Sequence, residues 1–331
     1  MDDTSLPLIF TALMAMAMLM YVVLDGYDLG VGILLPLADD AEKDRMIASI
    51  GPFWDANETW LVLGVGLLLV AFPVAHGAIL TALYLPVTAM LIGLILRGVA
   101  FDFRVKAHAD HKNLWNVAFF AGSSLAALAQ GFMLGNYIIG FRYDLPGVLF
   151  SLLIAAGLAA GYALLGATWI IIKCEGTLVH KAAHWAWRSL WLTGLGIAAV
   201  SLATPYMSPR IFEKWFALPN LFYLLPVPAF TAVVFAYSES RLRRILRGDV
   251  VSDWRPFAAA VGMFALAFGG LAYSLFPYLV LDRITLWDAA AAPASLRFML
   301  IGVLVTLPAI IGYTVFSYRV FWGRSSELSY E

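Results

Sequence analysis

The chain has 331 residues, of which 62% are hydrophobic and 13% are charged, and its formal net charge is −1. A soluble domain carries roughly 45–50% apolar and about 25% charged residues, so this composition excludes a water-soluble globule and indicates a protein that lies in lipid. The near-zero charge offers no basic stripe for a nucleic acid. The single cysteine, Cys174, excludes an internal disulfide framework and a cysteine-rich metal site.

The N-terminal segment, residues 1–5, contains two acids and no base. The apolar run that follows has no basic region before it and no small-residue cleavage site after it, so we predict no cleavable signal peptide. We expect this end of the chain to stay outside while the first helix anchors it.

Nine stretches are long and apolar enough to cross a bilayer, which takes about 20 mostly apolar residues. They are apolar on all sides, which favours a helical bundle over a membrane β-barrel with its alternating segments. The loops are short, so we predict one membrane domain over residues 1–331. The predicted spans are Leu6–Leu24 (with a possible extension to Leu37), Pro52–Phe72, Gly77–Leu96, Leu114–Tyr137, Gly147–Ile172, Trp187–Thr204, Asn220–Tyr237, Pro256–Leu281 and Leu296–Phe321.

Most of the 21 Lys and Arg residues fall in alternate loops between these spans. Cytoplasmic loops carry an excess of Lys and Arg, so we predict that the N-terminus lies outside and the C-terminus in the cytoplasm. The bases left for the outer side are Arg142, Arg210, Lys214, Arg283 and Arg297.

The first span continues into a glycine-rich stretch that carries Asp25 and Asp28. A carboxylate near the middle of a span costs about 2.5–3.5 kcal/mol on insertion scales, so such residues are rare and usually mark a pathway. Their spacing of three places both acids on one helix face. Two interpretations stay open, a pair that conducts protons and a pair that packs at a kink.

The second span opens with Pro52, which suits a first helical turn, followed by Asp55 and Glu58 at the same spacing of three. A carboxyl group shielded from water can accept and release a proton near neutral pH. We therefore predict a cytoplasm-facing proton path built from these two acids together with the pair on the first span, with Trp54 beside it.

The alternative interpretation of these four acids is structural: they cap helices or pair with Arg97 or Arg104 near the end of the third predicted span. A different function would also use them, since a proton-coupled secondary transporter needs membrane carboxylates. Against a transporter, the two halves of the chain show neither matched broken helices nor an obvious substrate site.

The five histidines lie near the ends of the predicted spans. None lies deep in a span, where an axial ligand to a membrane haem is expected. His180 and His184 have the spacing of two ligands on one helix, but no Glu or Cys completes a zinc site. We predict that this chain ligates neither haem nor metal.

Several short motifs occur in a fixed order along the chain, and their order and spacing resemble the second subunit of cytochrome bd-type quinol oxidases over essentially the whole length. The strongest are the two acid-bearing stretches described above. The motifs are Asp25–Gly32, Trp54–Trp60, Phe101–Arg104, Phe132–Asn136, Phe276–Tyr278, Leu286–Asp288 and Tyr318–Arg324.

This resemblance implies nine transmembrane helices arranged as two four-helix bundles plus a peripheral helix, in the cytoplasmic (inner) membrane of a bacterium. It implies pseudo-symmetric pairing with a similar first subunit, which carries haems b and d and the loop that oxidises quinol. A small accessory subunit is expected as a further partner, and some members of the family hold a structural quinone in the second subunit.

In that family the second subunit is needed for assembly and lends residues to the cytoplasmic proton path toward the oxygen-reducing haem. Asp55, directly after Trp54, occupies the position of the family's path aspartate. Glu58 stands where some members have Gln, so its carboxylate is a departure from the family pattern.

Overall fold

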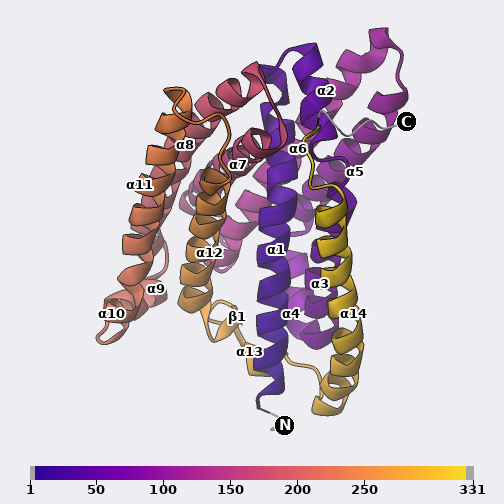
Figure 1. The fold of residues 1–331 in the computed structure, drawn as a ribbon. Coiled ribbons are helices and arrows are strands. Elements are labelled where there is room, and N and C mark those ends of the chain that lie inside the picture. The colour runs from indigo at the N-terminus through magenta and orange to yellow at the C-terminus, as the bar shows by residue number, and fades with distance from the viewer. Residues whose placement is uncertain (1–3, 326–331) are drawn as a thin grey trace.

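The computed structural model describes residues 4–325, apart from the side chains of residues 105, 109 and 110. It is almost entirely helical (Figure 1). Eight helices are long and apolar enough to cross a membrane, and a sharply bent pair makes nine if it counts as one span. The multi-span helical architecture expected from the sequence is therefore confirmed, while residues 1–3 of the acidic N-terminal segment lie outside the described residues.

The first helix, α1 (Leu6–Leu34), continues through the acid-bearing stretch without a break and is extended by a 3-10 turn, η1 (Leu35–Leu37). The extension of the first span to Leu37 is thus confirmed. A short polar helix follows, α2 (Asp40–Ala48). It is started by a capping box in which Asp39 accepts a hydrogen bond from the backbone N–H of Glu42 and the Glu42 side chain accepts one in return.

The second predicted span, Pro52–Phe72, agrees with the structure to within two residues at each end, whereas the third needs correction. Helix α3 (Trp54–Ala71) ends where Phe72 leaves the helical conformation, and α4 (Pro73–Ala82) begins there at an angle of 118°. A proline has no N–H for the preceding turn but fits the first position of a new helix. The backbone breaks again at Leu83, so the third span is α5 (Tyr84–Lys106) rather than the single run Gly77–Leu96.

The described residues after α5 form six further long helices with short elements between them. The predicted span Pro256–Leu281 is too long, because its helix ends at Leu275 and a small antiparallel hairpin, which the sequence did not predict, follows. The elements are α6 (Ala109–Ile138), α7 (Leu145–Lys173), α8 (Thr177–Met207), α9 (Pro209–Phe216), α10 (Asn220–Leu224), α11 (Pro226–Leu246), α12 (Arg255–Leu275), β1 (Tyr278–Val280), β2 (Ile284–Thr285), α13 (Leu286–Ala289) and α14 (Pro293–Val320).

Helix α1 stands in the middle of the molecule and packs against α3, α6 and α7 (Figure 1). Helices α5 and α6 pack on each other, and α7, α8, α11 and α12 contact one another on the other side of α1. Helix α14 lies at the edge, against α3. The start of α1, the hairpin, α9 and α10 lie at one end of the bundle, and α2 lies at the opposite end.

Close packing of α1 on α7 depends on glycines in the acid-bearing stretch. A Cβ added at Gly30 would lie 1.8 Å from the backbone oxygen of Tyr162, and one added at Gly166 would lie 2.4 Å from the carbonyl carbon of Gly30. Larger residues at either position would push the two helices apart. The glycines thus serve close helix packing within an unbroken helix.

Candidate functional site

Asp25 and Asp28 are both fully buried, with 0% of their surface exposed. They lie in the part of α1 that packs among α3, α6 and α7. Two acids in such a setting need partners or protons, since burying an unpaired charge costs far more than burying a neutral group. Their partners come from α5 and α3.

Arg97 of α5 lies between two of the predicted site residues. Its Nη1 is 2.8 Å from Oδ1 of Asp25, and its Nη2 donates a hydrogen bond to Oε1 of Glu58. The Arg97 side chain is 2% exposed and that of Glu58 is 33% exposed. The pairing with Arg97 that the structural interpretation anticipated is therefore present for one acid of α1 and one acid of α3.

Asn57 of α3 holds the other acid of α1. Its Nδ2 donates to Oδ2 of Asp28 at 2.8 Å and to the hydroxyl of Tyr27 at 2.8 Å. Tyr318 of α14 donates to Oδ1 of Asn57 at 3.2 Å, and its hydroxyl is 2.6 Å from that of Tyr27. These bonds join α1, α3 and α14.

We call Asp25, Asp28, Asn57, Glu58 and Arg97 the carboxylate cluster. It contains three carboxyl groups and a single guanidinium. Among the described residues no group donates a hydrogen bond to Oδ2 of Asp25 or to Oδ1 of Asp28. Buried polar atoms are nearly always hydrogen-bonded, and burial of a charged group is costly unless it is paired, so the second oxygen of each of these two carboxyls is an exception to the usual pattern.

Asp55 lies apart from the carboxylate cluster. Its side chain is exposed on the surface of the isolated chain, where the hydroxyl of Tyr313 donates to its Oδ2 at 3.4 Å. Asn57, two residues further along α3, points the opposite way into the bundle and is fully buried. The structure thus brings three of the four predicted acids together and leaves the fourth on the outer face of α3.

Trp54 is the first residue of α3, and its ring centroid is 5.3 Å from that of Phe101. Together with Gly98 and Ile50 these rings line a small hollow of about 10 Å³ that reaches Arg97. That volume is at the lower limit for one water molecule. The hollow lies between the start of α3 and the C-terminal part of α5 and borders Arg97 of the carboxylate cluster.

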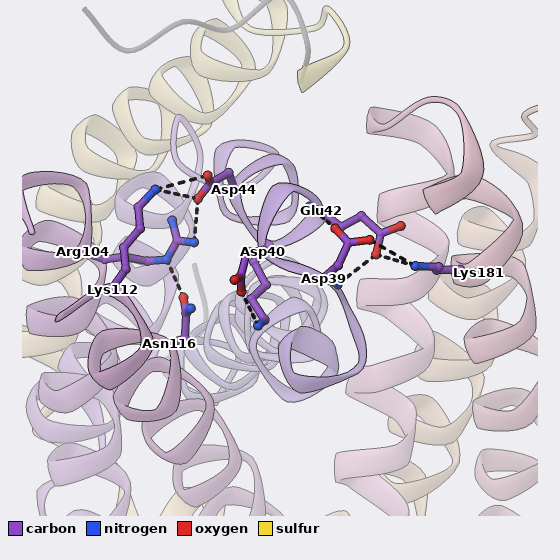
Figure 2. A network of polar contacts seen from close by, with 9 residues as sticks. Asp39, Asp40, Glu42, Asp44, Arg104, Lys112, Asn116 and Lys181 are labelled. Carbon is purple, nitrogen blue, oxygen red and sulfur yellow. Dashed lines mark hydrogen bonds and ion pairs between the residues drawn. The ribbon is translucent and has the colours of Figure 1, made fainter. Parts of the chain in front are cut away.

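A second set of ion pairs surrounds α2 (Figure 2). We call this set the α2 network, and its members are Asp39, Glu42, Asp44, Arg104, Lys112 and Lys181. Asp44 accepts hydrogen bonds from Arg104 at 2.7 Å and from Lys112 at 3.2 Å. Lys181 of α8 donates to Glu42 at 2.8 Å. Arg104 is therefore a partner of α2 and does not pair with the membrane acids.

The electrostatics of Asp44 follow from this network. Burial raises the pKa of its carboxyl, but the hydrogen bonds and charges of Arg104 and Lys112 outweigh burial and lower the pKa below its usual value. Asp44 is thus held in its charged form at the end of the bundle.

The five histidines lie near the ends of the long helices. His108, His111, His180 and His184 are exposed, and His76 is half-buried at the other end of the molecule. The rings of His180 and His184 are 5.0 Å apart, but the residues that the structure describes contain no group of three or more His, Cys, Asp or Glu side chains suited to a metal ion.

Two residues around Asp28 were not predicted from the sequence, namely Asn57 of the carboxylate cluster and its hydrogen-bond partner Tyr318. Asn57 lies inside a motif that was singled out, but only its acids were considered. Tyr318 belongs to the motif Tyr318–Arg324, and no role was predicted for it. For Asn57 the sequence offered a signal, because a polar amide in the first turn of an apolar helix is a candidate hydrogen-bond partner for the acids of a neighbouring span. For Tyr318 there was none, since its partners lie far away in the sequence.

Comparison with known proteins gives a consistent result. The sequence model of the family described as cytochrome bd terminal oxidase subunit II matches residues 6–321. The chain is 27% identical to cytochrome bd ubiquinol oxidase subunit 2 of Bacillus subtilis, with 95% of each chain covered. It is 25% identical to cytochrome bd-I ubiquinol oxidase subunit 2 of Escherichia coli K12, with 98% of this chain and 97% of the relative covered.

Among solved structures, a chain from the bd oxidase of Geobacillus thermodenitrificans superimposes with a TM-score of 0.69. The match covers 97% of this chain and 100% of the other at 11% identity. At that identity the match concerns the fold.

Proposed function

The chain belongs to the cytochrome bd terminal oxidase subunit II family, and from that premise we propose that it is the haem-free second subunit of a bd-type quinol:oxygen oxidoreductase. The positions of the five histidines support this role, because none is buried among the spans where a haem iron would need an axial ligand. Haems b and d and the oxidation of quinol belong to the partner, subunit I. The chain supports assembly of the complex.

The proposed setting is the inner membrane of a bacterium, with the N-terminus outside and the C-terminus in the cytoplasm. The excess of Lys and Arg in the loops at the α2 end supports this orientation. We further propose two four-helix bundles, with α1, α3, α5 and α6 in one and α7, α8, α11 and α12 in the other, and α14 as the peripheral helix. A small accessory subunit and a structural quinone belong to the same proposal.

The carboxylate cluster is the observation that carries the functional proposal. Reduction of oxygen to water takes up protons, and a charge-separating oxidase draws them from the cytoplasm. Each charge that crosses the membrane stores about 2.3 kcal/mol per 100 mV. Asp25, Asp28 and Glu58, with Asp55 at the surface, form the proposed relay. The surplus of carboxyls over guanidinium supports it, because such a group exchanges protons readily.

The outer face of α3 supports a proposal for the partner's position. Asp55 is exposed and Glu58 is partly exposed on a helix that belongs to the membrane. Charged groups in spans face a protein interior or water and not lipid. We therefore propose that subunit I covers this face of α3 and the adjoining face of α14 near Tyr313, so that protons pass from this chain to the partner there.

The test is the variant Asp55→Asn in the assembled oxidase. We expect oxygen-reduction turnover to fall sharply while assembly and haem content stay intact, because the amide keeps the shape but cannot carry a proton. Glu58→Gln should have a milder effect. Asp249→Asn removes an exposed acid in the loop between α11 and α12 and serves as the control.

Normal turnover in Asp55→Asn would refute its role in the proton path. Loss of assembly would instead support a structural role for this acid. A visible spectrum of the purified complex tests the wider proposal. A bd-type spectrum with no haem on this chain supports it, whereas a colourless chain that moves a solute by itself would identify a transporter.

A further inference from the structure

A hollow of about 260 Å³ lies where α5 ends and α6 begins, at the same end of the bundle as α2. It is separate from the carboxylate cluster, with which it shares no residue. The side chains that matter for its chemistry are Phe103, Lys106, His108, His111, Leu114 and Trp115.

One half of the hollow is apolar. The rings of Phe103 and Trp115 stack with centroids 5.2 Å apart. Phe103 is 56% exposed and Leu114 is 62% exposed. Phe103 belongs to the last turn of the span Tyr84–Arg104, and Leu114 to the first turn of the span His111–Ile138. The apolar half therefore lies where two spans leave the hydrocarbon layer.

The other half contains one lysine and two histidines. Lys106, His108 and His111 are exposed, and the described side chains that line the hollow include no acid. The neighbouring bases Arg104 and Lys112 are already paired with Asp44. Lys106, in contrast, makes no ion pair with a described side chain and lines the hollow.

We propose that this hollow binds an anionic phospholipid, with the phosphate at Lys106, His108 and His111 and the glycerol backbone over the two rings. An acyl chain would continue along α5 and α6, where Val99 is 41% exposed and Val117 is 56% exposed. Basic pockets between spans on the cytoplasmic side are suited to lipid headgroups. Charge complementarity selects an anion, and continuity with the lipid-facing surface selects a lipid over a soluble phosphate.

The test uses the purified oxidase complex with Leu114→Cys, labelled with a fluorophore. Leu114 is exposed, whereas Cys174 of the native chain is buried, so the label reports on the hollow. The complex without Leu114→Cys controls for labelling of other subunits. The probes are nitroxide-labelled phosphatidylglycerol and phosphatidylcholine in detergent micelles, and inorganic phosphate as a competitor.

We expect phosphatidylglycerol to quench the label at a several-fold lower mole fraction than phosphatidylcholine. Lys106→Gln should weaken the interaction with phosphatidylglycerol about fivefold, the contribution of one base near a membrane surface. Arg247→Gln, which removes an exposed base at the same end of the molecule, should leave the preference unchanged.

Equal quenching by the two lipids would overturn the proposal, and so would an undiminished preference in Lys106→Gln. Displacement of phosphatidylglycerol by inorganic phosphate at millimolar concentration would identify a site for free anions in place of a lipid. Because the readout is binding and not turnover, failure here would leave the proposed oxidase function untouched.

Discussion

The carboxylate cluster and the α2 network contain the same chemical groups in opposite surroundings. In the carboxylate cluster, Arg97 is 2% exposed and Asp25 is 0% exposed. In the α2 network, Lys112 is 40% exposed and Asp44 is 49% exposed (Figure 2). The first joins three helices inside the bundle, and the second ties α2 to α5, α6 and α8 at the end of the bundle.

This difference changes what an ion pair does for the protein. Exposed pairs contribute about 0–1 kcal/mol and are screened by salt. Buried pairs add little net stability over an apolar packing, but removal of one partner costs about 3–5 kcal/mol because a charge is left uncompensated. The carboxylate cluster therefore adds little net stability while it is intact, whereas the exposed pair of Lys112 and Asp44 can be removed at low cost.

The largest effect is expected for Arg97→Gln. This variant leaves Asp25 and Glu58 without their shared cation, so we expect a loss of about 3–5 kcal/mol in the stability of the assembled complex. Thermal unfolding of the purified complex measures it. Lys112→Gln, in the α2 network, is the control, because Lys112 is 40% exposed and its partner Asp44 is 49% exposed, and it should cost at most about 1 kcal/mol.

The double variant Arg97→Gln with Asp25→Asn sharpens this comparison. Removal of the unpaired carboxylate should restore part of the lost stability, since the penalty comes from the charge left behind. Equal losses for Arg97→Gln and Lys112→Gln would contradict the distinction between the two regions.

An intermediate effect is expected for Asn57→Leu. The substitution keeps the approximate shape but removes the donor to Asp28 and Tyr27, and a buried acceptor left without a donor costs about 1–3 kcal/mol. Thermal unfolding of the complex again measures the change. Tyr318→Phe should be milder, because Asn57 still donates to Asp28 in that variant. A larger loss of stability for Tyr318→Phe than for Asn57→Leu would mean that Asn57 is not the main hydrogen-bond partner among these residues.

The smallest effect is expected for Asp44→Asn, with a loss of less than about 1 kcal/mol at neutral pH. Because the folded protein lowers the pKa of Asp44, its contribution is fully present above the unfolded value of about 3.9 and is lost as the pH falls through the folded value. The stability difference between Asp44→Asn and the parent should therefore shrink toward zero on acidification and also decrease with added salt. A difference that grew at low pH would have the wrong sign for this network.

The sequence determined the broad architecture because each span satisfies its own backbone hydrogen bonds and must be apolar along its length. The sequence also singled out Asp25, Asp28 and Glu58, because placing an acid within an apolar span costs free energy whichever helices surround that span. It did not determine how the apolar stretch after α3 divides into α4 and α5. That depended on Pro73 and on the break at Leu83, and the hydrophobic pattern continues across both.

Only the tertiary structure decided which partners these acids have. Arg97, Asn57 and Tyr318 come from three different helices, and no local spacing relates them to α1. It also separated Asp55 from the other acids, because a helix that begins at Trp54 turns Asn57 and Asp55 to different sides. Polar partners inside a bundle are chosen by how whole helices pack, and that packing depends on close approaches such as Gly30 against Tyr162, which one helix read alone does not reveal.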